Sequence, residues 1–401
     1  MRIIKKIRQS GVHDYKYESI KSEVSVSYIE LYIPYLGRFT RNENSIHLYE
    51  HMCFNGWNGM SKEDSLNLLD KHFFLPNGST TAGEMRLYGY LRKDRRSSER
   101  ILFDMLTNSN MDEGLFQKEK ELIKKERQET GDYSCLVRHL IAESYRLAGF
   151  PPVMFKGFKD HLDSIEELTI EDMWYIRDNI LMNCCPEIHT FGIMDSVEKT
   201  QDDKFHWKRW RCPMVERSRG VELAVDGSSY NQKDYTTLIL WNLSRLSGND
   251  FLAFYLILAD LLNYANKDSF ISVLREKGIC YSLENTYLDY NNKNKIAYFV
   301  MDTKEPWNKI KDNIYEIFND CLFKNLTSEL FEYYKETSRF GFTLDDSDAV
   351  DLHLKQLSYT QRGLDVDCEA IPNIISNYTF DEFKKNLEIV KLENAVVTYS
   401  V

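Results

Sequence analysis

Two segments of this chain follow the same pattern, and this internal repeat constrains the fold more than any other feature. The first is NLLDKHFFL (Asn67–Leu75) and the second is SVLREKGIC (Ser272–Cys280), at an offset of 205 residues in a chain of 401. A helical pattern precedes each segment and a strand-like alternation follows it. Because the offset is close to half the chain length, the repeat indicates a duplicated domain and not a solenoid.

Strand and helix patterns alternate in both halves of the chain. We therefore predict an α/β fold of the α+β type, with two homologous domains, each a mostly antiparallel sheet covered by helices. The first domain is expected over residues 1–200, a polar linker over 201–224 and the second domain over 225–401. The predicted strands span 24–33, 85–91, 184–194, 235–243, 281–287, 295–301 and 395–399. The predicted helices of the first half span 45–54, 61–71, 97–106, 112–129, 135–147 and 168–180. Those of the second half span 250–264, 269–277, 307–321, 328–339, 346–357 and 380–389.

Composition excludes several classes of protein. The 62 acidic and 51 basic residues give a net charge of −11, which argues against a nucleic-acid binder. A membrane partner is not expected, because no apolar run reaches the roughly 18 residues of a spanning helix. No apolar segment follows the basic N-terminus, so we expect no signal peptide and a cytoplasmic location. The eight cysteines form no C-x-x-C pair and are expected to be reduced, buried thiols.

The motif that carries chemistry is H-x-x-E-H, formed by His47, Glu50 and His51. At about 100° per residue, the two histidines lie about 40° apart on a helix, with Glu50 about 60° to the other side of His47. Two imidazoles one turn apart can chelate one zinc ion, and a carboxylate beside them can accept a proton from water. The alternative is a surface helix that carries a His/Glu face without a metal.

A catalytic zinc ion needs a third protein ligand. The expected helix over 112–129 offers Glu119 and Glu126, which are seven residues apart and lie within about 20° of each other on one face. Leu122 and Ile123 flank that line, so we expect it to face the interior. The alternative is that both carboxylates are solvated among the many lysines of this helix.

Together these residues resemble the M16 (pitrilysin-like, inverzincin) metallopeptidases, particularly the half-length, processing-peptidase-like members. In that family H-x-x-E-H is followed some 75 residues later by a glutamate ligand, and His51 and Glu126 are 75 positions apart. The resemblance implies that His47, His51 and Glu126 bind one Zn²⁺ per chain. It implies that Glu50 is the general base and that Glu119 assists catalysis from beside the metal.

A segment after the motif resembles the N-A-x-T segment of the same family, which leads into an edge strand that pairs with the substrate backbone. It reads NGSTT from residue 77, with Gly78 where the family usually has alanine. The resemblance implies that four residues of this segment contact the substrate. They are Asn77, Gly78, Ser79 and Thr80.

The second half contains FISVLREKGICYS (Phe270–Ser282), which resembles the family pattern F-x-x-L-R-E-K-x-G-L-A-Y-S. There an arginine and a tyrosine help to hold the substrate across the cleft, and Arg275 and Tyr281 match them. The alternative for these two residues is an arginine that caps a helix and a tyrosine that packs in a strand.

The resemblance implies a zinc-dependent endopeptidase that cleaves extended peptides or leader and pre-sequence segments. It also implies a homodimer, or a heterodimer with a paralogous M16-like chain. The alternative is a catalytically silent subunit or peptide-binding partner in a heteromeric processing complex, for example one that trims leader peptides in the maturation of peptide natural products.

Overall fold

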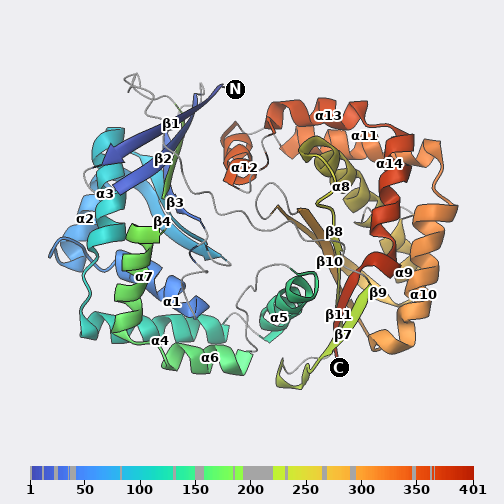
Figure 1. Cartoon of the computed structure of the whole chain (residues 1–401), viewed down its shortest axis with the longest axis horizontal. Coiled ribbons are helices and arrows are strands. Elements are labelled where there is room, and N and C mark those ends of the chain that lie inside the picture. Colours follow the sequence, from blue (N-terminus) through green and yellow to red (C-terminus); the bar gives the residue numbers. More distant parts are fainter. Residues whose placement is uncertain are drawn as a thin grey trace. The chain divides into compact units, whose positions relative to one another are not determined.

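A computed structural model shows the architecture of the chain (Figure 1). By contacts the chain divides into two compact units, here called unit 1 (Met1–Gly131 and Val153–Lys208) and unit 2 (Asp132–Pro152 and Arg209–Val401). The residues that the structure describes are 2–10, 13–21, 26–34, 36, 42–81, 84–129, 132–149, 158–183, 186–192, 220–230, 234–263, 269–289, 295–345, 349–361, 364 and 366–401.

Unit 1 is built on a six-stranded sheet with the strand order β1-β2-β6-β3-β5-β4. Neighbouring strands are antiparallel, except that β2 and β6 run parallel. The strands are β1 (Arg2–Ser10), β2 (His13–Lys21), β3 (Tyr28–Ile33), β4 (Phe73–Thr81), β5 (Glu84–Leu91) and β6 (Glu187–Gly192). The helices are α1 (Glu43–Cys53), α2 (Lys62–His72), α3 (Arg95–Asn108), α4 (Glu113–Glu129), α6 (Phe158–Glu166) and α7 (Ile170–Asn183).

Strand alternation builds the core of unit 1. Ile29, Leu31 and Ile33 of β3 are fully buried in one hydrophobic cluster with apolar residues of the helices, and β3 residues between them face the other side of the sheet. Helix α1 contacts strands β4 and β5 as well as α4 and α7. This position brings the helix that carries H-x-x-E-H next to both the edge of the sheet and the glutamate-rich helix.

Unit 2 is built on a five-stranded sheet with the order β7-β11-β8-β10-β9, in which only β7 and β11 run parallel. The strands are β7 (Val221–Val225), β8 (Tyr235–Asn242), β9 (Cys280–Asp289), β10 (Lys295–Thr303) and β11 (Val396–Ser400). The helices are α5 (Asp132–Leu147), α8 (Gly248–Asn263), α9 (Phe270–Glu276), α10 (Trp307–Asn319), α11 (Ser328–Asp345), α12 (Ala349–Gln361), α13 (Ile371–Asn377) and α14 (Phe380–Leu387).

The two sheets repeat one topology, so the predicted duplicated fold is confirmed. The order β6-β3-β5-β4 in unit 1 corresponds to β11-β8-β10-β9 in unit 2. Two helices connect equivalent strands in each unit, α1 and α2 between β3 and β4, and α8 and α9 between β8 and β9. The repeated sequence segments therefore occupy equivalent places, at the helix that leads into the last strand of each sheet.

Helix α5 belongs to unit 2, although it directly follows the helices of unit 1 in the chain. It contacts β8 and β11, and its buried Ser144 Oγ lies 2.9 Å from Thr398 Oγ1. Thr398 Oγ1 also donates to the carbonyl oxygen of Leu140, at 3.1 Å. The helical pattern of residues 132–147 does not reveal which sheet the helix covers. The domain bounds expected from the sequence, 1–200 and 225–401, stay a prediction.

Most of the expected elements are present with small shifts at their ends. Ser61 caps α2 as predicted, since its Oγ accepts a hydrogen bond from the backbone N–H of Asp64 at 3.1 Å. Strands β1, β2, β4 and β7 and helices α6 and α13 were not predicted. Residues 201–219 of the expected linker, together with 24–25, 184–185 and 193–194 of two expected strands, lie outside the described residues.

Two further sequence expectations concern cysteines and membrane helices. The four cysteines whose side chains the structure describes are buried thiols, as expected, and they are Cys53, Cys280, Cys321 and Cys368. Within the described ranges, none of the helices combines the length and the apolar character needed to cross a membrane.

Candidate metal centre

Helix α1 presents the H-x-x-E-H face because its other side is anchored in the core. Asn42 caps the helix, with its side-chain oxygen accepting from the backbone N–H of Asn44 at 3.1 Å. Tyr49 and Met52 are fully buried, and the Tyr49 hydroxyl donates to the carbonyl oxygen of Leu106 at 2.5 Å. The apolar residues therefore fix the rotation of α1 and turn the histidines toward α4.

His47, His51 and Glu126 form one cluster of ligand atoms. Nε2 of His47 lies 3.5 Å from Oε2 of Glu126, and Nε2 of His51 lies 3.7 Å from the same oxygen. The three ligand atoms all lie within 4.8 Å of one another. Two ligand atoms on one tetrahedral zinc ion are separated by about 3.3 Å, so these residues fit a single ion after small adjustments. The sequence prediction thus named three side chains that the structure brings together.

Glu119 lies beside the cluster but contacts a different nitrogen. Its Oε2 is 3.1 Å from Nδ1 of His51, and its Oε1 is 3.5 Å from the ammonium of Lys62. Burial opposes ionisation of Glu119, but the contacts with His51, Asn55 and Lys62 outweigh it and lower its pKa. An ionised Glu119 accepts the Nδ1 proton of His51, which leaves the lone pair of Nε2 directed at the cluster.

Glu50 is held between α1 and strand β4. It is only 8% exposed, and its Oε2 accepts a hydrogen bond of 2.5 Å from the hydroxyl of Thr80. Gly78 lies against the same carboxylate, since a Cβ at residue 78 would stand 2.6 Å from Oε1 of Glu50. Burial raises the pKa of Glu50, although Thr80 and His51 act in the opposite direction.

The charge of the surrounding acids also affects His51. Burial lowers the pKa of this imidazole, but the hydrogen bond with Glu119 and the charges of Glu126 and Glu50 outweigh burial, so the net pKa is raised. The negative charges of these carboxylates around the two imidazoles favour the binding of a cation, either a proton or a metal ion.

Sequence reasoning missed two cations at this site, Arg127 and Lys62. Nη2 of Arg127 lies 3.5 Å from Nδ1 of His47, on the side away from Glu126. Helix geometry places Arg127 about 100° from its neighbour Glu126, so periodicity gave no reason to expect it near the metal ligands. Only the packing of α4 against α1 brings it there.

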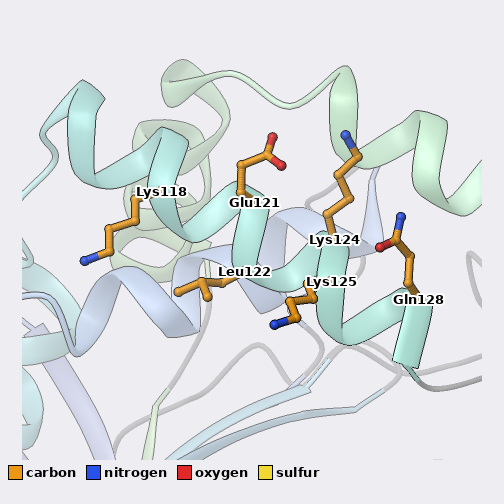
Figure 2. A pocket seen from close by; sticks show the side chains of 6 residues that line it. All are labelled: Lys118, Glu121, Leu122, Lys124, Lys125 and Gln128. Atoms are coloured by element: carbon orange, nitrogen blue, oxygen red, sulfur yellow. The ribbon is translucent and has the colours of Figure 1, made fainter.

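The outer face of α4 carries a separate hollow (Figure 2). None of the side chains that line it belongs to the cluster, and they are Lys118, Glu121, Leu122, Lys124, Lys125 and Gln128. Ile123 is fully buried whereas Leu122 is 41% exposed. The sequence predicted that the line of Glu119 and Glu126 faces the interior. That prediction is confirmed for the buried Glu119 and wrong for the exposed Glu126, because only the Ile123 side of α4 packs in the core.

The other predicted site residues lie on β4 in unit 1 and on α9 and β9 in unit 2. The segment Asn77–Thr80 lies on β4, the last strand in the sheet order of unit 1. In unit 2, Nε of Arg275 donates to the carbonyl oxygen of Tyr281 at 2.5 Å, and its guanidinium lies 5.1 Å from the centre of the Tyr281 ring. Tyr281 is 83% exposed, so the alternative of a tyrosine packed in a strand is wrong.

No family model and no curated protein matches this chain, but solved structures do. A protease from Helicobacter pylori has a TM-score of 0.72 at 12% identity, over 100% of this chain and 99% of that one. An M16-like peptidase from Alicyclobacillus acidocaldarius has a TM-score of 0.69 at 14% identity, over 100% and 99% of the two chains. An inactive M16 peptidase domain from Pseudomonas fluorescens has a TM-score of 0.71 at 11% identity, over 99% and 98%. At these identities the likeness shows the fold, which is M16-like over the whole chain.

Proposed function

We propose that this chain is a zinc-dependent endopeptidase that cleaves extended peptides. The observation that carries the proposal is the cluster of His47, His51 and Glu126, whose ligand atoms lie within 4.8 Å of one another. Two imidazole nitrogens and one carboxylate oxygen are a ligand set typical of catalytic zinc. The M16-like fold supports the same activity.

In this proposal His47, His51 and Glu126 hold the metal. Zinc, when bound, supplies a Lewis acid that polarises the scissile carbonyl and favours ionisation of water. Glu50 accepts the proton of the attacking water and passes it to the leaving amine. The raised pKa of Glu50 suits that role, because it brings proton uptake and release closer to neutral pH. Glu119 positions the His51 ring through Nδ1.

Strand β4 supports an extended peptide as the substrate. As the last strand of its sheet, β4 has one backbone edge directed away from β5, and a peptide can add to such an edge through main-chain hydrogen bonds. Gly78 and Thr80 of this strand also contact Glu50, so a paired peptide would pass the proposed base. In unit 2, Arg275 offers a cation and Tyr281 an exposed aromatic ring. We propose that both side chains contact the substrate peptide.

The test combines zinc content by elemental analysis with cleavage of a peptide library, followed by mass spectrometry with and without a chelator. We expect chelator-sensitive cleavage by the wild type. Glu50→Gln should keep zinc and lose at least about 100-fold in rate, whereas His51→Ala should lose both. Glu121→Gln, on the outer face of α4, is the matched control and should behave as the wild type.

A second set of variants tests the choice of carboxylate ligand. Glu126→Ala should empty the site, whereas Glu129→Ala should leave zinc content unchanged. If the wild type binds no zinc and cleaves no peptide, the endopeptidase proposal is wrong and a silent, peptide-binding role replaces it. The expected homodimer, or heterodimer with a paralogous chain, stays a prediction. Sedimentation measurements on the purified protein and on its complexes would test it.

A further inference from the structure

Strand β4 contains a bulge just before the segment that faces Glu50. Phe74 pairs with Tyr90 and Asn77 pairs with Tyr88, so three steps along β4 match two steps along β5. The extra residue lies at Leu75–Pro76, where Leu75 has a φ of +50°. This left-handed conformation is strained for leucine, and such strain is concentrated at functional sites.

The bulge presents two large apolar side chains to solvent. Leu75 is 77% exposed and Phe74 is 49% exposed. The guanidinium of Arg92 lies 3.7 Å from the centre of the Phe74 ring, and Nε of Arg92 donates to the carbonyl oxygen of Phe73 at 3.0 Å. These contacts hold one face of the Phe74 ring. The exposed remainder of Phe74 and the exposed side chain of Leu75, which follows it in the chain, are here called the bulge patch.

The bulge also limits where a peptide can pair with the strand. Pro76 has no backbone N–H, and bulges end regular pairing. The regular edge of β4 is therefore Asn77–Thr81, which includes Gly78 and Thr80 at the Glu50 carboxylate. At about 3.3 Å per residue, Leu75 lies about 10–16 Å along the strand from these two residues. A peptide paired with the edge would reach the bulge patch three to five residues from the bond beside Glu50.

We infer that the bulge patch, Phe74 and Leu75, is a binding subsite for an apolar side chain of the peptide substrate, about three to five residues from the cleaved bond. The inference rests on the proposed function for its substrate. Continuity with the β4 edge favours a peptide as the occupant, because the same strand supplies both the hydrogen-bonding edge and the patch. Because Leu75 is strained, its replacement by glycine should not lower stability, whereas replacement of a leucine with a purely structural role would.

Leu75→Gly is the decisive variant. Glycine adopts a positive φ without strain and removes the apolar side chain, so the melting temperature should rise or stay constant. Cleavage of peptides with an apolar residue at the stated spacing should fall about tenfold, while peptides without one should be unaffected. Leu122→Ala, which removes an exposed leucine of α4, is the matched control and should leave the peptide profile unchanged.

The residue preferences in the cleaved peptide library test whether the bulge patch is a subsite. Enrichment of apolar residues three to five positions from the cleaved bond in the wild type, lost in Leu75→Gly, supports the subsite. An unchanged profile in Leu75→Gly would overturn it, as would equal losses of stability and of cleavage for all peptides. If Leu75→Gly instead abolishes a concentration-dependent self-association of the wild type, a second copy covers the patch and the subsite is wrong.

A binding measurement separates this inference from the proposed function. Calorimetric binding of uncleaved synthetic peptides to Glu50→Gln and to Glu50→Gln/Leu75→Gly does not depend on catalysis. Weaker binding of apolar-containing peptides to the double variant supports the subsite even if the wild type cleaves nothing. Equal binding to both variants overturns the subsite even if the wild type is an active peptidase.

Discussion

Thr80 donates a hydrogen bond of 2.5 Å to Glu50, a residue 30 positions earlier in the chain. The donor lies on the edge strand β4 and the acceptor on the zinc-motif helix α1, so one contact joins the proposed peptide-binding strand to the proposed base. The substrate contact expected for Thr80 stays a prediction, and this relationship adds a second proposed role, in which the hydroxyl orients the carboxylate of Glu50.

Replacing Thr80 with valine removes the donor and keeps the shape of the side chain. Because hydrogen bonds to charged groups are among the stronger ones, we expect kcat to fall roughly tenfold with KM and zinc content little changed. Thr80→Ser retains the hydroxyl and should restore most of the rate. Steady-state kinetics on a fluorogenic peptide checks this, and a normal kcat for the valine variant would show that Thr80 does not orient Glu50.

Gly78→Ala tests the space that the Glu50 carboxylate occupies. The added Cβ would stand 2.6 Å from Oε1 and 2.9 Å from Cδ of Glu50, so the carboxylate must move. We expect a loss of kcat of roughly 3- to 30-fold with little change in melting temperature, because the displaced group is a side-chain end. Gly341→Ala, where an added Cβ would meet no atom within 4 Å, is the control. Unchanged kinetics for Gly78→Ala would mean that Glu50 does not depend on this position.

Arg127→Gln should strengthen zinc binding. The guanidinium lies 3.5 Å from Nδ1 of His47, and its charge opposes a second cation at the cluster. We expect the zinc dissociation constant to fall by roughly 3- to 10-fold, measured by competition with a chromogenic chelator. Lys125→Gln removes the same charge from the outer face of α4 and should have a smaller effect. Equal effects of the two variants would assign the change to net charge alone.

Zinc affinity should depend on pH through His51. Burial lowers the pKa of His51, but Glu119, Glu126 and Glu50 raise it above its ordinary value of 6.5. The metal must displace the proton, so affinity should fall as pH drops through this raised pKa, earlier than for an ordinary imidazole. Glu119→Gln weakens the effect and should move the midpoint to lower pH. Chelator competition between about pH 5.5 and 8 measures it, and an unmoved midpoint would contradict the role of Glu119.

Asp260 should make unit 2 less stable as pH rises. Burial raises the pKa of Asp260 in the folded protein, although the hydroxyl of Ser338 donates to its carboxylate and acts in the opposite direction. Between the ordinary and the raised pKa the folded state binds more protons than the unfolded state, so the free energy of unfolding falls with rising pH across that window. Asp260→Asn should remove this slope and unfold at higher urea concentration near pH 7. The exposed Asp312→Asn is the control, and identical slopes for wild type and Asp260→Asn would contradict the prediction.

The sequence alone was sufficient where local periodicity sets the geometry. The repeat at an offset of 205 residues predicted the two equivalent sheets. The spacing of His47, Glu50 and His51 placed all three on one face of α1, because positions within one helix have a fixed angular relationship. The resemblance to a known spacing then selected Glu126, which the structure brings to within 3.5 Å of His47.

Only the tertiary structure decided which groups meet across different elements. It placed Thr80 on Glu50 and Arg127 on His47, it grouped α5 with unit 2, and it formed the bulge at Leu75. The physical reason is that these relationships depend on how helices and strands bury their apolar faces against one another. A residue's neighbours within its own helix or strand follow from the spacing, whereas its partners from distant segments depend on the packing of the whole unit.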